Sequence, residues 1–429
     1  MRCFIISKKN ILIKLVFEAY VKYGKFLKKI IPISLRGKFK ALINDNLSNN
    51  IEFDHNTNAV FEKGINLIGY IKAEMGLGHS CRLLASALDL TDISWTAVNY
   101  DKLNAVRHQE NIWDHKISNT IKYNTSIIHI NPDNLKIASM YLPKDTWKVK
   151  YNIAYILWEL EKLPKEWISI LSNFDEIWAP SSFIANNINK AIDKPVYLIP
   201  YGIEFDIKKD YSRQYFNLPE NVFLFLTMYD YNSTSQRKNP YGSIQAFKSA
   251  FKKDDDHVGL IIKINNTKGQ AEKEIEFLKN NLAGYKNIFF IENTLEQDEV
   301  YGLINLCDCF ISLHRSEGFG LVIAESMYLK KPVIATNWSA NIEFMNETSA
   351  CLVDFSFTKI KSDLGIYKAG QRWAEPDYLH AANYMNRLVS DAEYYHLISE
   401  NAHRLIKTHY SMQNSASMIK KRLNALNLL

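Results

Sequence analysis

The sequence has few cysteines and lacks long apolar runs. Its five cysteines in 429 residues have neither the spacing of a disulfide framework nor that of zinc ligands. This pattern excludes a small disulfide-bonded secreted domain and predicts a reducing compartment. No stretch of about 18 uninterrupted apolar residues occurs, so we expect no transmembrane helix.

The remaining composition is that of an ordinary globular protein, with 47% hydrophobic and 23% charged residues. The length predicts two domains or more. Of the net charge of +6, residues 1–50 contribute +9, because eleven Lys and Arg stand there against Glu18 and Asp45, and the rest of the chain carries −3. A nucleic-acid-binding domain needs a basic face on its folded part, so we expect no nucleic-acid partner.

The basic front end contains the stretch NILIKLVFEAYVKYGKFLKKII, residues 10–31. Its polar residues are spaced four, four, three and four apart: Lys14, Glu18, Lys22, Lys25 and Lys29. This spacing predicts an amphipathic helix with a narrow polar stripe, and the lysines exclude a signal peptide. The helix either docks in a groove of its own protein or of an oligomer partner, or lies in a membrane interface. Further basic residues favour the second interpretation, so residues 10–40 are predicted to contact an anionic membrane surface.

From residue 60 on, short apolar runs alternate with helical patterns. The predicted strands are 65–71, 93–98, 126–130, 152–157, 175–180 and 195–200, then 223–228, 258–264, 287–292, 309–314, 332–336 and 351–355. Apolar strands separated by helices are typical of parallel sheets covered on both faces. The two series, joined near residues 201–219, predict an α/β chain of two Rossmann-like, doubly wound domains facing across a cleft.

The segment CFISLHRSEGFGLVIAESMYL, residues 309–329, combines features of a ligand site. In an open parallel sheet, ligands bind beyond the carboxyl ends of the strands. Gly318 and Gly320 let the backbone approach a ligand, and the free N–H groups of the following helix favour an anion. Glu317 and Glu325 flank this helix start and can accept hydrogen bonds from hydroxyls. The pattern therefore favours a nucleotide sugar over the alternative of two solvated or helix-capping carboxylates.

A pair of cations, Arg237 and Lys238, follows the predicted strand 223–228. It precedes a helix in which Asn239 is the expected cap and Pro240 the first residue. Two cations beside a helix start can stabilise a departing nucleoside diphosphate. The alternative is an exposed turn.

Gly76-Leu77-Gly78 follows the first predicted strand and could begin a dinucleotide fingerprint. The position of the third glycine is Cys81, however, and no acidic residue stands near position 96. A dinucleotide-dependent oxidoreductase is therefore an alternative with little support.

Taken together, residues 314–325 resemble the E-x7-E signature of the family-4 retaining glycosyltransferases, which have the GT-B fold. The resemblance covers about residues 62–400, with further matching segments at 76–78, 174–188, 198–206, 235–240 and 331–345. The sequence is most similar to bacterial enzymes that build O-antigen, capsule or related surface polysaccharides. The resemblance implies transfer of a hexose such as mannose from a nucleotide diphosphate sugar to a saccharide acceptor. A fold-conserving protein without catalytic activity remains an alternative.

The resemblance also implies the roles of individual residues. Glu317 would contact hydroxyls of the donor sugar and Glu325 those of the ribose, while the backbone amides of residues 319–321 and the basic pair would face the diphosphate. The implied donor-binding residues are Gly76, Gly78, Arg237, Lys238, Lys263, Arg315, Glu317, Gly318, Phe319, Gly320, Leu321 and Glu325. The predicted catalytic residues are Arg237, Lys238 and Glu317, together with Asp133 and Glu159, which are chosen from their positions after predicted strands and not from the resemblance.

Many members of the family carry a histidine in the N-terminal domain, and its counterpart here is open. Asp133 and Glu159 follow predicted strands and are favoured for positioning the acceptor, whereas His129 and Trp158 are more typical of core residues. We expect neither a cofactor nor a metal, because no D-x-D motif follows an apolar strand and Asp254–Asp256 resembles a solvated turn.

The expected domains are a basic helical extension (1–58), an N-terminal acceptor domain (59–203), a nucleotide-sugar domain (204–392) and C-terminal helices that pack back toward the N-terminal domain (393–429). The basic extension suggests a lipid-linked acceptor. We therefore expect a cytoplasmic protein, peripheral on the cytoplasmic face of the inner membrane.

Overall fold

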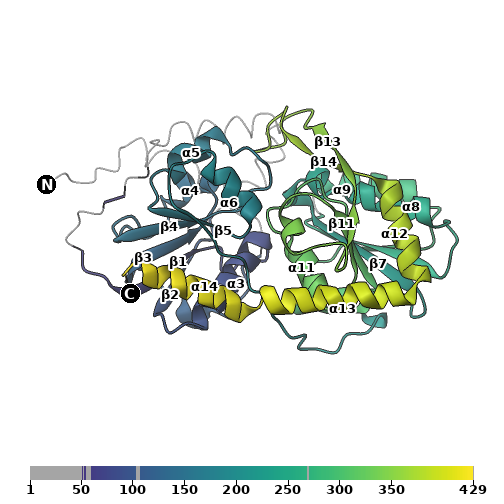
Figure 1. Cartoon of the computed structure of the whole chain (residues 1–429), viewed down its shortest axis with the longest axis horizontal. Helices are drawn as coiled ribbons and strands as arrows, with labels where there is room; N and C mark the ends of the chain where they lie inside the picture. The colour runs from purple at the N-terminus through teal and green to yellow at the C-terminus, as the bar shows by residue number, and fades with distance from the viewer. Residues whose placement is uncertain (1–50, 52, 55–58, 103–106, 268–269, 429) are drawn as a thin grey trace.

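The computed structural model describes residues 51–428 apart from 52, 55–58, 103–106 and 268–269. The predicted amphipathic helix and its membrane contact lie outside the described residues. The described part forms two lobes that lie side by side (Figure 1). Among its helices, none is long and apolar enough to cross a membrane. The four cysteines that it describes are buried and unpaired.

The first lobe is built on a six-stranded sheet in the order β2-β1-β3-β4-β5-β6, in which all neighbouring strands are parallel. Its elements are β1 (Glu62–Gly69), α3 (Gly76–Asp89), β2 (Trp95–Asn99), η1 (Asp114–Lys116), β3 (Tyr123–His129), α4 (Pro132–Ala138), β4 (Tyr151–Tyr155), α5 (Lys165–Leu171), β5 (Glu176–Ala179), α6 (Ser182–Asn189) and β6 (Val196–Leu198). Aliphatic side chains of β1 to β5 are buried, as expected for a sheet covered on both faces, whereas the edge strand β6 is partly exposed.

The second lobe repeats this plan, with a parallel sheet in the order β12-β11-β10-β7-β8-β9. Its elements are η2 (Gln214–Phe216), β7 (Phe223–Asp230), η3 (Tyr231–Ser233), α7 (Ser235–Lys238), α8 (Pro240–Ala250), β8 (Val258–Asn265), α9 (Gln270–Leu282), β9 (Ile288–Ile291), α10 (Gln297–Leu306), β10 (Cys309–Ser312), α11 (Leu321–Tyr328), β11 (Val333–Thr336), η4 (Ala340–Glu343) and β12 (Cys351–Val353). The predicted pair of doubly wound domains is thereby confirmed.

An antiparallel hairpin of β13 (Phe355–Lys359) and β14 (Arg372–Pro376) follows β12. The sequence pattern gave no sign of it, because its strands are short, partly exposed and separated by residues 360–371, without the tight turn that marks most hairpins. In Figure 1 the hairpin stands at the top of the second lobe.

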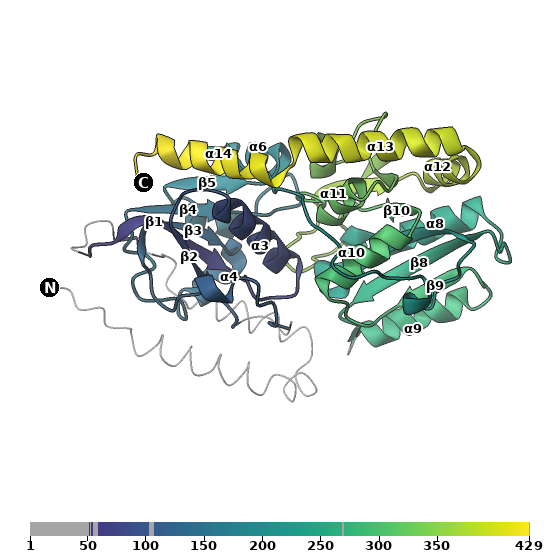
Figure 2. The same ribbon diagram turned by 90° about the horizontal axis from the view of Figure 1, so that it is seen from below.

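Three helices complete the chain: α12 (Tyr378–Ser390), α13 (Ala392–His409) and α14 (Met412–Ala425). Helix α13 runs along the second lobe beside α11, and α14 lies against α3 of the first lobe (Figure 2). The guanidinium of Arg422 in α14 pairs with the buried carboxylate of Glu176 in β5. The chain thus returns to the lobe in which its described part begins.

The two lobes contact each other directly along their shared boundary. The hydroxyl of Ser181 donates a hydrogen bond of 2.8 Å to the carbonyl of Gly318. The carboxylate of Glu343 in the second lobe accepts hydrogen bonds of 2.9 Å from the backbone N–H groups of Ser182 and Phe183, the first residues after the cap of α6. Of the predicted site residues, Glu159, Arg315 and 317–320 lie on loops that follow strands, whereas the others lie in helices or, for Lys263, in β8.

Candidate active site

The centre of the site is the connection between β10, which ends at Ser312, and α11, which begins at Leu321. Gly320 caps α11 with a φ of +95°, in the left-handed region that glycine adopts without strain. The first N–H groups of the helix have no intrahelical acceptor. Glu317 and Glu325 flank this helix start and are only 7% and 2% exposed. Both carboxylates lie at the boundary between the lobes, as the nucleotide-sugar interpretation requires.

Glu317 is held by both predicted cations. The Nζ of Lys238 is 2.6 Å from its Oε1 and the Nη1 of Arg237 is 3.4 Å from its Oε2. Its backbone N–H donates to the hydroxyl of Ser339 at 2.8 Å. Burial alone would raise the pKa of Glu317, but the two cations outweigh it and lower this pKa to about 2. Glu317 is therefore an ionised hydrogen-bond acceptor at neutral pH.

Arg237 is 4% exposed and reaches both lobes. Its Nη1 donates to the carbonyl of Ser316 at 2.9 Å and its Nη2 to that of Ser233 at 3.3 Å. The same Nη2 lies 3.4 Å from Oε1 of Glu159 in the first lobe. Burial alone would lower the pKa of Arg237, but Tyr367 and the neighbouring carboxylates raise it above its usual value. Its Nε has no hydrogen-bond partner among the described residues.

Arg237 and Lys238 are positioned by the residue that follows them, Asn239, which is the predicted cap of α8. Asn239 has a φ of +51°, and its side chain accepts a hydrogen bond from the N–H of Gly242 at 3.2 Å. The side-chain amide of Asn239 also donates to the carbonyl of Leu313 at 2.8 Å, which ties the loop to the end of β10. Pro240 is the first residue of α8. The predicted cap and first residue are confirmed.

Glu325 contacts a residue that sequence reasoning missed. The Nε2 of His79 lies 2.6 Å from Oε1 of Glu325, and the hydroxyl of Tyr301 donates to the same oxygen at 3.5 Å. His79 directly follows the Gly76-Leu77-Gly78 turn, and this position was the available signal. Glu325, assigned to ribose hydroxyls by resemblance, is thus also a contact between the lobes.

The two glycines of the first lobe differ in what surrounds them. A Cβ on Gly76, the first residue of α3, would meet no atom within 4 Å. A Cβ on Gly78 would stand 2.0 Å from the carbonyl oxygen of Ala73, which the guanidinium of Arg82 also holds by a hydrogen bond of 2.9 Å. Gly78 is therefore required by the fold of its own turn, whereas Gly76 borders open space.

Gly318 and Phe319 also have structural roles of their own. A Cβ on Gly318 would lie 3.1 Å from the carbonyl oxygen of Trp158, so this glycine lets the two lobes approach each other. The ring of Phe319 is 3% exposed and packs edge-on against Tyr201, with ring centroids 5.1 Å apart. The donor contact predicted for Gly318 thus gains no support from this packing, and the role predicted for residues 319–321 rests on their backbone.

Of the two acidic residues predicted to position the acceptor, the structure brings Glu159 to the cations. Its Oε1 faces Arg237, and its Oε2 accepts a hydrogen bond of 2.9 Å from the hydroxyl of Tyr367. Asp133 lies in the first turn of α4 and, together with burial, raises the pKa of Tyr70. Asp133 is not among the partners of Arg237 and Lys238 in the described part of the chain.

The remaining first-lobe candidates are core residues. His129 is fully buried, its Nε2 lies 2.9 Å from the hydroxyl of Ser80, and burial lowers its pKa to about 4. Trp158 is fully buried, donates from Nε1 to the carbonyl of Lys162 at 3.1 Å, and stacks on Tyr367. Packing, the favoured interpretation for both, is confirmed.

The side chains of Lys263 and Arg315 form hydrogen bonds with residues other than Glu317. Buried Lys263 donates from Nζ to the carbonyl of Ile264 and to Oδ1 of Asn265, and burial lowers its pKa to about 8. The guanidinium of Arg315 forms two hydrogen bonds, of 2.7 and 2.9 Å, with the carboxylate of Glu375 in β14. Their donor contacts stay predictions.

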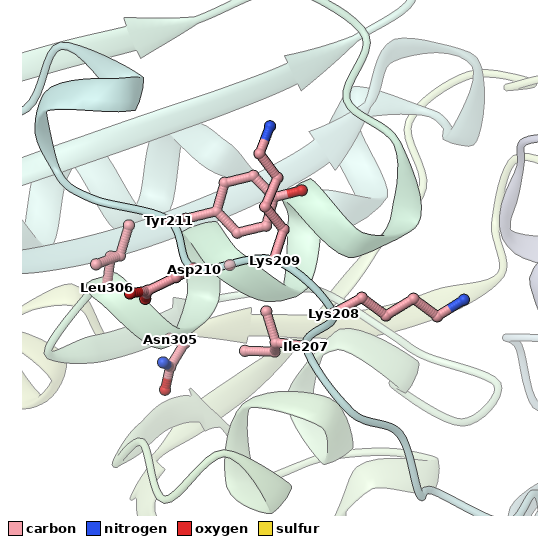
Figure 3. Close-up of a pocket in the computed structure, with 8 residues that line it drawn as sticks. Ile207, Lys208, Lys209, Asp210, Tyr211, Asn305 and Leu306 are labelled. Atoms are coloured by element: carbon pink, nitrogen blue, oxygen red, sulfur yellow. The ribbon is translucent and has the colours of Figure 1, made fainter.

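No group of three or more His, Cys, Asp and Glu in the described residues could hold a metal ion. The predicted turn Asp254–Asp256 lies between α8 and β8, with Asp254 and Asp256 exposed. A pocket of about 350 Å³ is shown in Figure 3, where Lys209 lies over the ring of Tyr211. Its lining residues are Ile207, Lys208, Lys209, Asp210, Tyr211, Gly302, Asn305 and Leu306, none of which is a predicted site residue.

Comparisons with known proteins bear on the fold and the class of enzyme. Residues 210–356 match the family model described as Glycosyl transferases group 1. Among solved structures, Anabaena HepE in complex with UDP and glucose is 15% identical, with a TM-score of 0.60 over 85% of this chain and 100% of that chain. Sucrose-phosphate synthase from Thermosynechococcus elongatus is 13% identical, with a TM-score of 0.60 over 85% and 99% of the two chains.

WaaG, a glycosyltransferase involved in lipopolysaccharide biosynthesis, is 13% identical, with a TM-score of 0.52 over 83% of this chain and 99% of that chain. No curated protein matches the sequence. The shared architecture is the GT-B fold, and together with the family match it makes the chain a glycosyltransferase. The oxidoreductase alternative is thereby set aside.

Proposed function

We propose that this glycosyltransferase of GT-B fold transfers a hexose, such as mannose, from a nucleotide diphosphate sugar to a saccharide acceptor, with retention of the anomeric configuration. The observation that carries the proposal is the burial of two carboxylates, Glu317 and Glu325, on either side of the free N-terminus of α11, with Arg237 and Lys238 beside them. The complex of HepE with UDP and glucose supports a nucleotide sugar as donor.

The donor would bind along this arrangement. Its diphosphate would accept hydrogen bonds from the backbone amides of residues 319–321, where the helix dipole favours negative charge. Ribose hydroxyls would donate to Glu325 and sugar hydroxyls to Glu317. Because His79 already contacts Glu325, and Lys238 contacts Glu317, the hydroxyls would share or replace these partners.

The chemical step breaks the bond between the anomeric carbon and the phosphate oxygen while the acceptor oxygen bonds to the same carbon. In a retaining transfer the hydroxyl attacks from the face that the phosphate leaves, so the departing phosphate oxygen can take up the hydroxyl proton. The negative charge that develops on the diphosphate would be stabilised by Arg237 and Lys238. Contact of the lobes excludes water and limits donor hydrolysis.

Glu159 would position the acceptor, because it is the first-lobe carboxylate that faces Arg237. We further propose a lipid-linked saccharide acceptor in cell-surface polysaccharide synthesis, with the protein peripheral on the cytoplasmic face of the inner membrane. The basic segment 10–40 supports this location, and a structural neighbour acts in lipopolysaccharide biosynthesis. Deleting residues 1–50 should reduce co-sedimentation with anionic vesicles, and unchanged co-sedimentation would count against the membrane contact.

A donor screen tests the transfer itself. The purified full-length chain is incubated with UDP-, GDP- and dTDP-sugars together with extracted lipid acceptor, and released nucleotide is measured. We expect turnover of one sugar nucleotide, and loss of that turnover in Glu317→Gln. Absence of both binding and turnover across the panel would overturn the proposed function.

A further inference from the structure

The β13–β14 hairpin belongs in sequence to the second lobe but packs into the core of the first. Ile360, Tyr367 and Trp373 are each 6% exposed or less and join the apolar side chains of the first lobe. The tip is fixed by two backbone hydrogen bonds between Leu364 and Tyr367, of 2.9 and 3.1 Å, with Gly365 at a φ of +64° in the turn. A local turn therefore holds Tyr367 at the boundary of the lobes.

Tyr367 contacts the core residue Trp158 and two residues of the site, Arg237 and Glu159. Its ring stacks on Trp158 with centroids 5.5 Å apart, and Cζ of Arg237 lies 5.9 Å from the ring centroid. Its hydroxyl donates to Oε2 of Glu159 at 2.9 Å. Since Oε1 of the same carboxylate faces Arg237 at 3.4 Å, the hydroxyl and the guanidinium hold the two oxygens of one carboxylate.

The base of the hairpin is tied to the loop that carries Arg237. The N–H of Ala374 donates to the carbonyl of Arg315 at 3.0 Å, and the N–H of Arg315 donates to the carbonyl of Arg237 at 2.8 Å. On the other side, Arg372 forms two hydrogen bonds, of 2.6 and 2.8 Å, with Glu161 of the first lobe. The hairpin thus connects the segment around Glu159 with the backbone of Arg237.

These contacts matter because Arg237 lies between two carboxylates, Glu317 from its own lobe and Glu159 from the other. The two carboxylates offset part of the positive charge of Arg237, and a diphosphate near Arg237 interacts with the charge that remains. The position of Glu159 therefore affects how strongly Arg237 attracts the diphosphate. We propose that Tyr367 is a positioning residue: its hydroxyl fixes Glu159 and thereby aligns the guanidinium of Arg237 with the departing diphosphate. This inference rests on the proposed function.

The alternative is that Tyr367 only stabilises the contact between the lobes. Tyr367→Phe distinguishes the positioning role from the purely stabilising role. The variant keeps the ring that stacks on Trp158 and removes the hydroxyl that holds Glu159. We expect kcat to fall roughly tenfold with the donor KM within about twofold. Because the same hydrogen bond to a charged group also contributes to stability, the unfolding midpoint should fall as well. A lower midpoint with unchanged kcat would overturn the proposal.

A double-mutant cycle completes the test. If Tyr367 acts through Glu159, Tyr367→Phe should cost nothing further in a Glu159→Ala background, in which the acceptor of its hydroxyl is gone, whereas equal losses in both backgrounds would overturn the inference. Tyr211→Phe is the matched control, because the hydroxyl of Tyr211 also donates to a carboxylate, that of Asp298 at 3.0 Å, outside the site. A wild-type chain without turnover overturns the proposed function and this inference together. An active wild type with additive losses overturns the inference alone.

Discussion

The Nε2 of His79 in the first lobe lies 2.6 Å from Oε1 of Glu325 in the second. The two residues are 246 positions apart in the chain, and both are largely buried. The carboxylate assigned to the ribose is therefore also a point at which the lobes hold each other. In the proposed complex, binding of the nucleotide and contact between the lobes would depend on the same carboxylate.

Replacing His79 by Ala should make nucleotide binding tighter. The variant removes a competitor for Oε1 of Glu325 and leaves a buried carboxylate that a ribose hydroxyl can satisfy, a gain of about 1 kcal/mol or roughly fivefold in Kd. Calorimetric titration with the nucleoside diphosphate identified in the donor screen measures the change. Weaker binding would instead show that His79 contacts the donor.

Replacing Arg237 or Lys238 by Ala should each lower kcat/KM by about 100-fold or more, because each removes a preorganised donor worth about 3–4 kcal/mol at the transition state. Steady-state kinetics with the preferred donor checks this. Lys330→Ala is the matched control, since Lys330 is half exposed and pairs with Glu400 outside the site. Full activity of either site variant would refute its role.

The two glycines of the first-lobe turn should respond differently to alanine. Gly78→Ala places a Cβ against the carbonyl of Ala73 and should lower the unfolding midpoint. Gly76→Ala meets no neighbouring atom, so it should leave the midpoint unchanged and raise the donor KM if the donor passes this position. Thermal unfolding and kinetics of both variants separate the effects. An unchanged KM in Gly76→Ala would contradict the donor contact.

Stability should fall as the pH drops from about 6.5 toward 4. Burial lowers the pKa of both His129 and His314 to about 4, whereas in the unfolded chain a histidine titrates near 6.5. In this window the unfolded state binds more protons, so the free energy of unfolding decreases with falling pH, by up to about 2 kcal/mol per histidine at pH 5. Urea unfolding at pH 7 and pH 5 measures the decrease, which should be smaller in His314→Asn. An equal decrease in wild type and variant would exclude a contribution from His314.

Glu317 should affect the stability of the protein in a lower pH window than the two buried histidines. Its pKa is lowered in the folded protein, so its contribution to stability is complete above about pH 4.5 and is lost as the pH falls toward 2. Glu317→Gln should therefore reduce the free energy of unfolding at pH 7 and reduce it less at pH 3. A difference between variant and wild type that does not change with pH would contradict the ion pair with Lys238 and Arg237.

Local sequence patterns were sufficient to predict the two parallel sheets, the cap of α8 and the glycine at the start of α11. The apolar runs predicted the strands because both faces of each sheet are buried, and Asn239-Pro240 predicted the start of α8 because capping depends on neighbouring residues. The glycine at the start of α11 was recognised for the same reason, since Gly320 alone decides whether the backbone can take a φ of +95°.

Contacts between distant segments could not be predicted in this way. Tyr367 and Glu159 are 208 positions apart, and no spacing in the sequence relates them. Gly318 resembled a residue that makes room for a ligand, yet the atoms nearest its missing side chain belong to Trp158 and Ile184 of the first lobe. The sequence indicates that a small residue is needed, but only the packing reveals which atoms need the space.

The return of α14 to the first lobe makes the two halves of this protein inseparable as fragments. A piece ending near residue 203 would expose the face of α3 that α14 covers, and it would leave Glu176 buried without the guanidinium of Arg422. Helix α14 follows every strand of the second lobe in the chain, so during synthesis the first lobe cannot complete this packing until the second lobe has been made. Completion of the first lobe's surface therefore depends on a segment that is synthesised after the second lobe.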